Sequence, residues 1–264
     1  MAWHLWRTIR SEWDLLRLSL LFYTRIPVGH VAYHEERMGE SFRYFPLLGA
    51  IVGAVMAGIY ALAGYYLPNA VAAVMSVIVG LVVTGGMHED GLSDYCDAFG
   101  GYHDRDTTLR IMKDSSTGVY GILGLVMLLM SRVVLLSYIP YETAIGTIVA
   151  MAVVARWMPI LVMRLSTYAR KSDEASKATH LRQAVTTKTL LIAAVWALLA
   201  LLLLPWQAAV VAPVLMIGQS LLIMRISNKR IGGHTGDVLG AIECLTELTL
   251  LLVTLVVSIY ACPV

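Results

Sequence analysis

The residues best suited to chemistry are three aspartates in one short stretch. Asp90, Asp94 and Asp97 are spaced i, i+4 and i+7, so a helix would place all three carboxylates on one face. Like charges this close repel unless a cation neutralises them. Oxygen-only ligands suit Mg²⁺, which usually keeps several waters and completes its shell with substrate phosphates. We therefore predict a magnesium site here, against the alternative of a solvated acidic loop with helix caps.

The wider segment 88–117 is acidic in a chain that is not. It holds seven acids and three bases, a net charge of −4, whereas the whole chain carries +2. A net charge of +2 gives no electrostatic reason to expect nucleic acid binding, and we predict none. The acidic charge is local, and we predict that 88–117 is an active-site segment.

A second stretch, 230–240, could bind phosphate. Gly233 and Gly236 would let backbone N–H groups approach an anion, and Thr235 lies between them, just before an apolar run. The N-terminus of the following helix would also favour negative charge. Asp237 could be an N-cap or a further metal ligand. A simple turn before a helix is the alternative interpretation.

A third stretch, 110–118, combines two bases with hydroxyl groups. Capping alone would explain Ser115 and its polar neighbours. Phosphate binding explains Arg110 and Lys113 better, because cations pair with phosphate oxygens. We predict that these residues bind substrate phosphate.

These stretches are separated by long apolar runs. The chain is 58% hydrophobic and 14% charged, whereas ordinary domains are about half apolar and a quarter charged. Runs long enough, or nearly so, to cross about 30 Å of hydrocarbon occur at 44–67, 70–87, 118–139, 143–163, 189–205, 208–225 and 238–261. We predict an all-α fold, a polytopic transmembrane bundle of about seven spanning helices that forms one domain over 1–264.

The distribution of charge orients this bundle. Of the 20 Lys and Arg residues, 18 lie in 1–43, 88–117, 164–188 and 225–237, which share one face under the predicted topology. The positive-inside rule places this face in the cytoplasm. We predict a multi-pass protein of the inner membrane whose active site faces the cytoplasm.

Charged residues also fall inside the predicted spans. Arg132, Arg156, Glu243 and Glu247 would be costly in lipid unless they pair within the bundle. Two interpretations stay open: these residues form ion pairs that join the helices, or they take part in the site. Glu243 could still line a cleft.

The segment before the first span has a different pattern. Trp3, Trp6, Ile9 and Trp13 recur at helical spacing while bases occupy other faces. We predict an amphipathic helix in the membrane interface, within an N-terminal segment 1–41.

Taken together, these stretches resemble the cobalamin synthase family. The motifs that carry the resemblance are Phe22 to Pro27, Phe45 to Gly49, His88 to Asp97, Met112 to Ser115 and Gly233 to Gly240. They occur in the family's order and cover nearly the whole chain. The chain departs from the family pattern at Ser93, Tyr95, Cys96, Ser116 and Thr117, which leaves the carboxylates untouched.

The resemblance implies a Mg²⁺-dependent transferase for the last assembly step of coenzyme B12. It would join adenosylcobinamide-GDP to α-ribazole, or to its 5′-phosphate, and release GMP. Asp90, Asp94 and Asp97 would hold the metal, with Asp237 as a fourth ligand. Arg25, Arg110 and Lys113 would offset the charge of the diphosphate, with Ser115, Gly233, Thr235 and Gly236 as further phosphate-binding residues. His88 is a candidate general base, and an aspartate such as Asp97 could serve equally.

Two other functions are weighed against this one. A phosphotransferase that acts on CDP-alcohols also uses an Asp-Gly motif at a membrane surface, but the Asp94-Tyr95 pair and the lack of a later aspartate pair depart from its pattern. A cation transporter would explain the charges inside the spans. However, the carboxylates lie at a helix end and no inverted repeat is visible.

Overall fold

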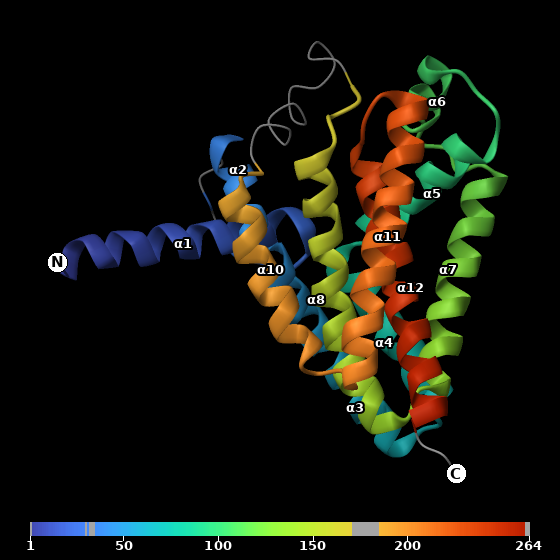
Figure 1. Cartoon of the computed structure of the whole chain (residues 1–264). Helices are drawn as coiled ribbons and strands as arrows, with labels where there is room; N and C mark the ends of the chain where they lie inside the picture. Colours follow the sequence, from blue (N-terminus) through green and yellow to red (C-terminus); the bar gives the residue numbers. More distant parts are fainter. Residues whose placement is uncertain (1, 30, 32–34, 171–184, 262–264) are drawn as a thin grey trace.

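Every predicted apolar run forms a helix in the computed structural model, which describes residues 2–29, 31, 35–170 and 185–261 (Figure 1). The predicted cytoplasmic segment 164–188 therefore lies partly outside the described residues. The elements are α1 (Ala2–Tyr23), α2 (Glu35–Ser41), η1 (Phe42–Tyr44), α3 (Phe45–Tyr66), α4 (Asn69–Thr84), α5 (Met87–Gly100), α6 (Arg105–Ile111), α7 (Val119–Tyr138), α8 (Tyr141–Leu165), α10 (Thr187–Leu201), α11 (Trp206–Ile231) and α12 (Gly236–Ala261). Since the described residues otherwise form only one isolated β-bridge, the predicted all-α fold is confirmed.

The predicted count of seven spanning helices is too high by length and composition. In the described residues five helical stretches, which contain α3, α7, α8, α11 and α12, are long and apolar enough to cross a membrane. A sixth crossing is possible only if α4 and α5, which are bent by 91°, count as one. α10 has 15 residues, about 22 Å at 1.5 Å per residue. Its apolar run continues past Leu201, but the backbone leaves the helix there, before Pro205.

The bend between α4 and α5 depends on two glycines. Gly85 and Gly86 have φ angles of 73° and 71°, in the left-handed region that favours glycine. The backbone N–H of Arg25 donates to the Val83 carbonyl at 2.7 Å, which ties the segment after α1 to the end of α4. As a result α5 turns out of the direction of α4 and lies with α6 at one end of the bundle (Figure 1), outside the membrane-crossing helices.

α5 packs against α12 through close backbone contact. A Cβ atom on Gly91 would lie 3.2 Å from the Asp237 Cα, and one on Gly240 would lie 3.0 Å from the His88 carbonyl oxygen. Larger side chains would push the two helices apart. These glycines therefore bring the acidic face of α5 to the first turn of α12.

α1 projects sideways from the bundle (Figure 1). Trp6, Ile9 and Trp13 are exposed, whereas Leu15 and Leu18 near the other end are buried. An exposed apolar stripe on a helix beside a transmembrane bundle fits the predicted interfacial position. The predicted residue Trp3 belongs to the part of α1 whose side chains are not described.

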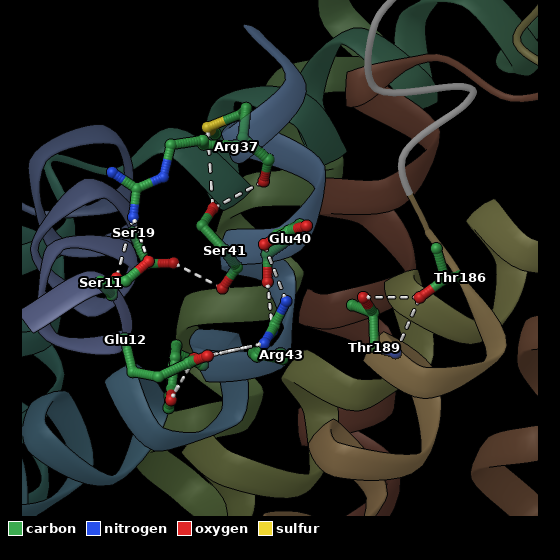
Figure 2. Close-up of polar contacts among 11 residues, drawn as sticks. Ser11, Glu12, Ser19, Arg37, Glu40, Ser41, Arg43, Thr186 and Thr189 are labelled. Carbon is green, nitrogen blue, oxygen red and sulfur yellow. Dashed lines mark hydrogen bonds and ion pairs between the residues drawn. The ribbon is translucent and has the colours of Figure 1, made fainter. Parts of the chain in front are cut away.

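Polar contacts hold α1 against α2 and η1 (Figure 2). Arg43 forms ion pairs with Glu12 at 3.2 Å and with Glu40 at 3.0 Å. The Ser19 hydroxyl donates to the Ser41 carbonyl at 2.9 Å. Because these contacts join residues from α1, α2 and η1, they fix the N-terminal segment to the start of α3.

The charged residues predicted inside the bundle are paired. Arg132 on α7 forms ion pairs with Glu89 and Glu247. Arg156 on α8 lies 3.2 Å from Glu243. We call these five residues the buried ion network. The predicted internal pairing is confirmed. Glu89 also belongs to the buried ion network, although the sequence analysis counted it only among the acids of 88–117.

Candidate active site

Four aspartates meet where α5 reaches the start of α12. Asp94 is half-buried between Asp90, Asp97 and Asp237. Burial, followed by the charges of Asp237, Asp90 and Asp97, raises the pKa of the Asp94 carboxyl to about 7. The structure therefore brings together the four carboxylates that were predicted as metal ligands, and we call them the aspartate cluster.

The members of the aspartate cluster differ in their partners. Asp97 accepts hydrogen bonds from the backbone N–H groups of Gly118 at 2.7 Å and Gly121 at 2.8 Å, so it caps α7. Asp237 accepts from Thr235. No hydrogen bond or ion pair within the described residues engages the carboxylates of Asp90 and Asp94. The sequence did not predict the capping role of Asp97.

The donor set has the right chemistry for magnesium. All four side chains offer carboxylate oxygens, which suit Mg²⁺ better than softer metals. The crowded charge at Asp94 is a second feature that a cation would relieve. However, in the described part of the chain no three His, Cys, Asp or Glu side chains stand in a geometry that could hold a metal ion. The metal site stays a prediction.

Arg170 is a site residue that the sequence analysis missed. Its guanidinium lies 3.4 Å from the Asp237 carboxylate and donates to the Met112 carbonyl at 3.5 Å. The positive charge of Arg170 lowers the pKa of Asp94, whereas the neighbouring aspartates raise it. Only the basic character of 164–188 pointed toward it, because this contact joins segments that are distant in the sequence.

The glycine-rich stretch before α12 has mainly structural contacts. A Cβ on Gly233 would lie 2.0 Å from the Thr167 carbonyl oxygen, so this glycine permits close backbone packing. Thr235 is fully buried, and its hydroxyl accepts from the Val238 N–H at 3.3 Å as a helix cap. Gly236 alone has open space where a Cβ would be. The predicted phosphate-binding role of these residues stays a prediction, strongest for Gly236.

The predicted phosphate-binding side chains Arg25, Arg110, Lys113 and Ser115 are all exposed. Arg110, Lys113 and Ser115 are exposed on α6 and the turn after it. Met112 between them is buried against the Thr235 hydroxyl, 3.6 Å away, which holds this turn beside Asp237. Arg25 is also exposed and lies over the turn between α4 and α5.

His88 lies between the aspartate cluster and the buried ion network. Its Nδ1 is 3.1 Å from Glu243 Oε1, and its ring contacts Phe45 at 6.0 Å between centroids. Its Nε2 is buried with no hydrogen bond among the described residues. His88 Nδ1 therefore lies at ion-pair distance from Glu243 without a hydrogen bond to it, its Nε2 is buried, and burial lowers the pKa of the imidazole to about 3.

A cavity of about 510 Å³ adjoins these residues. Its acidic and imidazole side chains are those of His88, Asp90, Asp237 and Glu243, all from the packed helices α5 and α12, and we call this side its polar end. Tyr23 adds one phenol from α1. The rest is apolar and comes from the N-terminal elements, α3, α5, α8 and α12. We call it the apolar cavity. It confirms the expectation that Glu243 could line a cleft, and nothing in the sequence pattern predicted its walls.

These features define a multi-pass membrane protein with an acidic site at one end of its helical bundle. The family model for cobalamin-5-phosphate synthase matches residues 15–255. The chain is 38% identical over 262 residues to the adenosylcobinamide-GDP ribazoletransferase of Shewanella oneidensis and 37% identical to that of Shewanella baltica strain OS185. Each alignment covers 97% of both chains. No solved structure matches the chain significantly.

The chain belongs to the cobalamin-5-phosphate synthase family. It is therefore a transferase of cobalamin biosynthesis, and the resemblance stated from its motifs is confirmed. The CDP-alcohol and transporter interpretations are not supported by these comparisons.

Proposed function

We propose that the chain joins adenosylcobinamide-GDP to α-ribazole or α-ribazole 5′-phosphate and releases GMP. The main support for this proposal is the aspartate cluster, where carboxylates from α5 and α12 lie beside the apolar cavity. The names of the relatives supply the two substrates. Although α4 and α10 are shorter than the predicted spans, each still leads the chain from one end of the bundle toward the other (Figure 1). The described parts of the basic segments therefore lie toward the end that carries α5 and α6, which supports an inner-membrane position with this site on the cytoplasmic side.

The reaction exchanges one phosphorus–oxygen bond for another. The ribose hydroxyl oxygen attacks the phosphorus attached to the cobinamide side chain, and the bond from that phosphorus to the bridging oxygen breaks. GMP leaves with the bridging oxygen, and the hydroxyl proton passes to a protein base. In-line placement and neutralisation of charge are what such a transfer requires from a protein.

Each part of the site has a role in this proposal. Asp90, Asp94, Asp97 and Asp237 would hold Mg²⁺, which when bound offsets the negative charge of the diphosphate. Arg170 forms an ion pair with Asp237 at 3.4 Å and so keeps this carboxylate in place. His88 is the proposed proton acceptor through its Nε2 atom, which has no hydrogen bond in the described residues. An aspartate of the cluster is the alternative base.

The phosphate groups would be bound from outside the cluster. Arg25 on one side and Arg110 and Lys113 on the other supply positive charge. Ser115 can donate a hydrogen bond through its hydroxyl. Gly236, the first residue of α12, has open space where a Cβ would be, so a phosphate could approach the helix N-terminus there.

The test is an assay of GMP release and cobalamin formation by the full chain in detergent. Adenosylcobinamide-GDP and α-ribazole are supplied with Mg²⁺ or with a chelator. We expect product only with Mg²⁺ and a loss of about 10²- to 10³-fold in Asp94→Asn, typical of removing a group that stabilises transition-state charge. Asp106→Asn, an exposed acid on α6, is the matched control. Equal rates in both variants would exclude the proposed role of Asp94.

A further inference from the structure

We propose that the apolar cavity is the binding site for the aromatic base of the acceptor nucleoside. This inference rests on the proposed function and adds a location and a recognition chemistry to it. The acceptor is a benzimidazole riboside, which combines a flat apolar base with a polar ribose. A cavity with one apolar and one ionisable end matches that division.

The walls of the cavity are suited to a flat apolar ring. Phe42 and Phe45 contact each other edge to face at 6.2 Å, and Tyr23 lies 4.6 Å from Phe45. Met38 and Met163 add flexible apolar side chains. Aromatic rings and thioethers favour stacking and edge contacts with another aromatic system.

The N-terminal elements give this wall a defined position. Met38 lies on α2 and Phe42 on η1, and both are buried. The hydrogen bond from Ser19 to Ser41 and the ion pair of Arg43 with Glu12 join these elements to α1 (Figure 2). A wall fixed in this way can discriminate between bases by shape.

The polar end of the cavity puts the ribose where the reaction needs it. Asp90 and Asp237 line the cavity and also belong to the aspartate cluster. A nucleoside whose base lies in the apolar part would extend its ribose toward these residues and toward His88. The attacking hydroxyl would then approach the diphosphate that the cluster is proposed to bind.

The other substrate fits the cavity less well. Guanine carries donors and acceptors along its edge, and leaving them unpaired against the apolar walls is costly. Phe42, Phe45 and Met163 offer no hydrogen-bonding group. The corrin ring with its amide side chains is too large for about 510 Å³, whereas this volume is within the usual range for a small ligand.

Met163 on α8 is the best position for a test, because it is buried in the cavity wall and lies outside the aspartate cluster. Met163→Trp should fill the cavity, and Met163→Ala should enlarge it. Met127→Trp, at an exposed position of α7 in a groove away from the site, is the control for the introduced ring.

Two measurements are made on the full chain in lipid nanodiscs. The first is equilibrium binding of α-ribazole in the presence of a chelator and without the GDP substrate. The second is kcat/KM for α-ribazole and for a riboside of the larger naphthimidazole base. We expect Met163→Trp to weaken α-ribazole binding about tenfold or more, with KM for adenosylcobinamide-GDP unchanged. Met163→Ala should shift the ratio of kcat/KM values about tenfold toward the larger base. This is the discrimination typical of small size changes in an apolar pocket.

The outcomes separate this inference from the proposed function. If the wild type forms cobalamin and neither variant changes nucleoside binding or base selectivity, the cavity does not hold the base. If Met163→Trp raises KM for the GDP substrate instead, the cavity holds the donor and the inference is wrong. If Met163→Trp does not fold, the selectivity of Met163→Ala decides. A wild type that makes no cobalamin would overturn the proposed function itself.

Discussion

Glu89 and Asp90 are neighbours on α5, yet they belong to regions with opposite electrostatics. Glu89 is in the buried ion network, where its carboxylate pairs with Arg132. Asp90 is exposed at the aspartate cluster and has no such partner among the described residues. One helix thus carries a paired carboxylate on one side and, within the described part of the chain, unpaired carboxylates on another, and the two sides meet at consecutive residues.

The difference shows what each region does. In the buried ion network, three carboxylates face two guanidinium groups, and the pairs join α5, α7, α8 and α12. In the aspartate cluster, four carboxylates face a single guanidinium among the described residues, that of Arg170. Buried charge that is paired holds helices together, whereas crowded charge that stays unpaired is typical of a site that binds a cation or reacts.

The largest expected effect comes from breaking the buried ion network. Arg132→Met would leave Glu89 and Glu247 buried without their partner, which costs about 3–5 kcal/mol. Denaturant unfolding of the purified protein in detergent measures this loss. The double variant Arg132→Met with Glu247→Gln should recover part of it, because one unpaired charge is removed. A single variant within about 1 kcal/mol of the wild type would show that the pairs do not stabilise the bundle.

A smaller effect tests whether Asp97 acts as the cap of α7, as a charge of the aspartate cluster, or as both. Asp97→Ala removes the cap of α7 and should cost about 1 kcal/mol of unfolding free energy. Asp97→Asn keeps one acceptor oxygen, so it can accept from the Gly118 or the Gly121 N–H group but not from both, and it should retain part of that stability while losing activity if the charge is needed at the cluster.

Asp104→Ala is the matched control, since Asp104 caps α6 through the Thr107 N–H at 2.7 Å. It should lose stability without a specific loss of turnover. Full activity in Asp97→Asn would leave Asp97 with the capping role alone.

A third expected effect is a pH dependence of stability in the absence of metal. The pKa of Asp94 is raised from 3.8 to about 7 in the folded chain, so the folded state binds more protons than the unfolded state between these values. Stability from this group is therefore lost as the pH rises from about 4 to about 7. With a chelator present, the thermal midpoint of the wild type should fall more over this range than that of Asp94→Asn. Parallel curves would contradict the crowding of charge at Asp94.

The sequence was sufficient for the parts of the molecule that depend on local pattern. Apolar runs predicted each helix of the bundle, and the i, i+4, i+7 spacing predicted the shared face of Asp90, Asp94 and Asp97. The length of α10 was overestimated, because hydropathy does not register where a backbone leaves the helix. Leu202 continues the apolar run but not the helix.

Contacts between distant segments were beyond such patterns. Arg170 and Asp237 are far apart in sequence, and only the folded chain places the guanidinium beside the carboxylate. The apolar cavity depends in the same way on Phe42 from η1 and Met163 from α8. Asp97 illustrates a third case, since the predicted spacing was right but the cap of a later helix was not foreseen.

The contact of Gly91 and Gly240 has a mechanical consequence. Where two helices touch through their backbones, the gap between them cannot narrow, and it cannot be adjusted by a side chain changing its rotamer. α5 and the first turn of α12 therefore act as one stiff unit at the end of the bundle. When tilt or bilayer thickness changes the arrangement of the long helices, the spacing of Asp90 and Asp237 should stay constant.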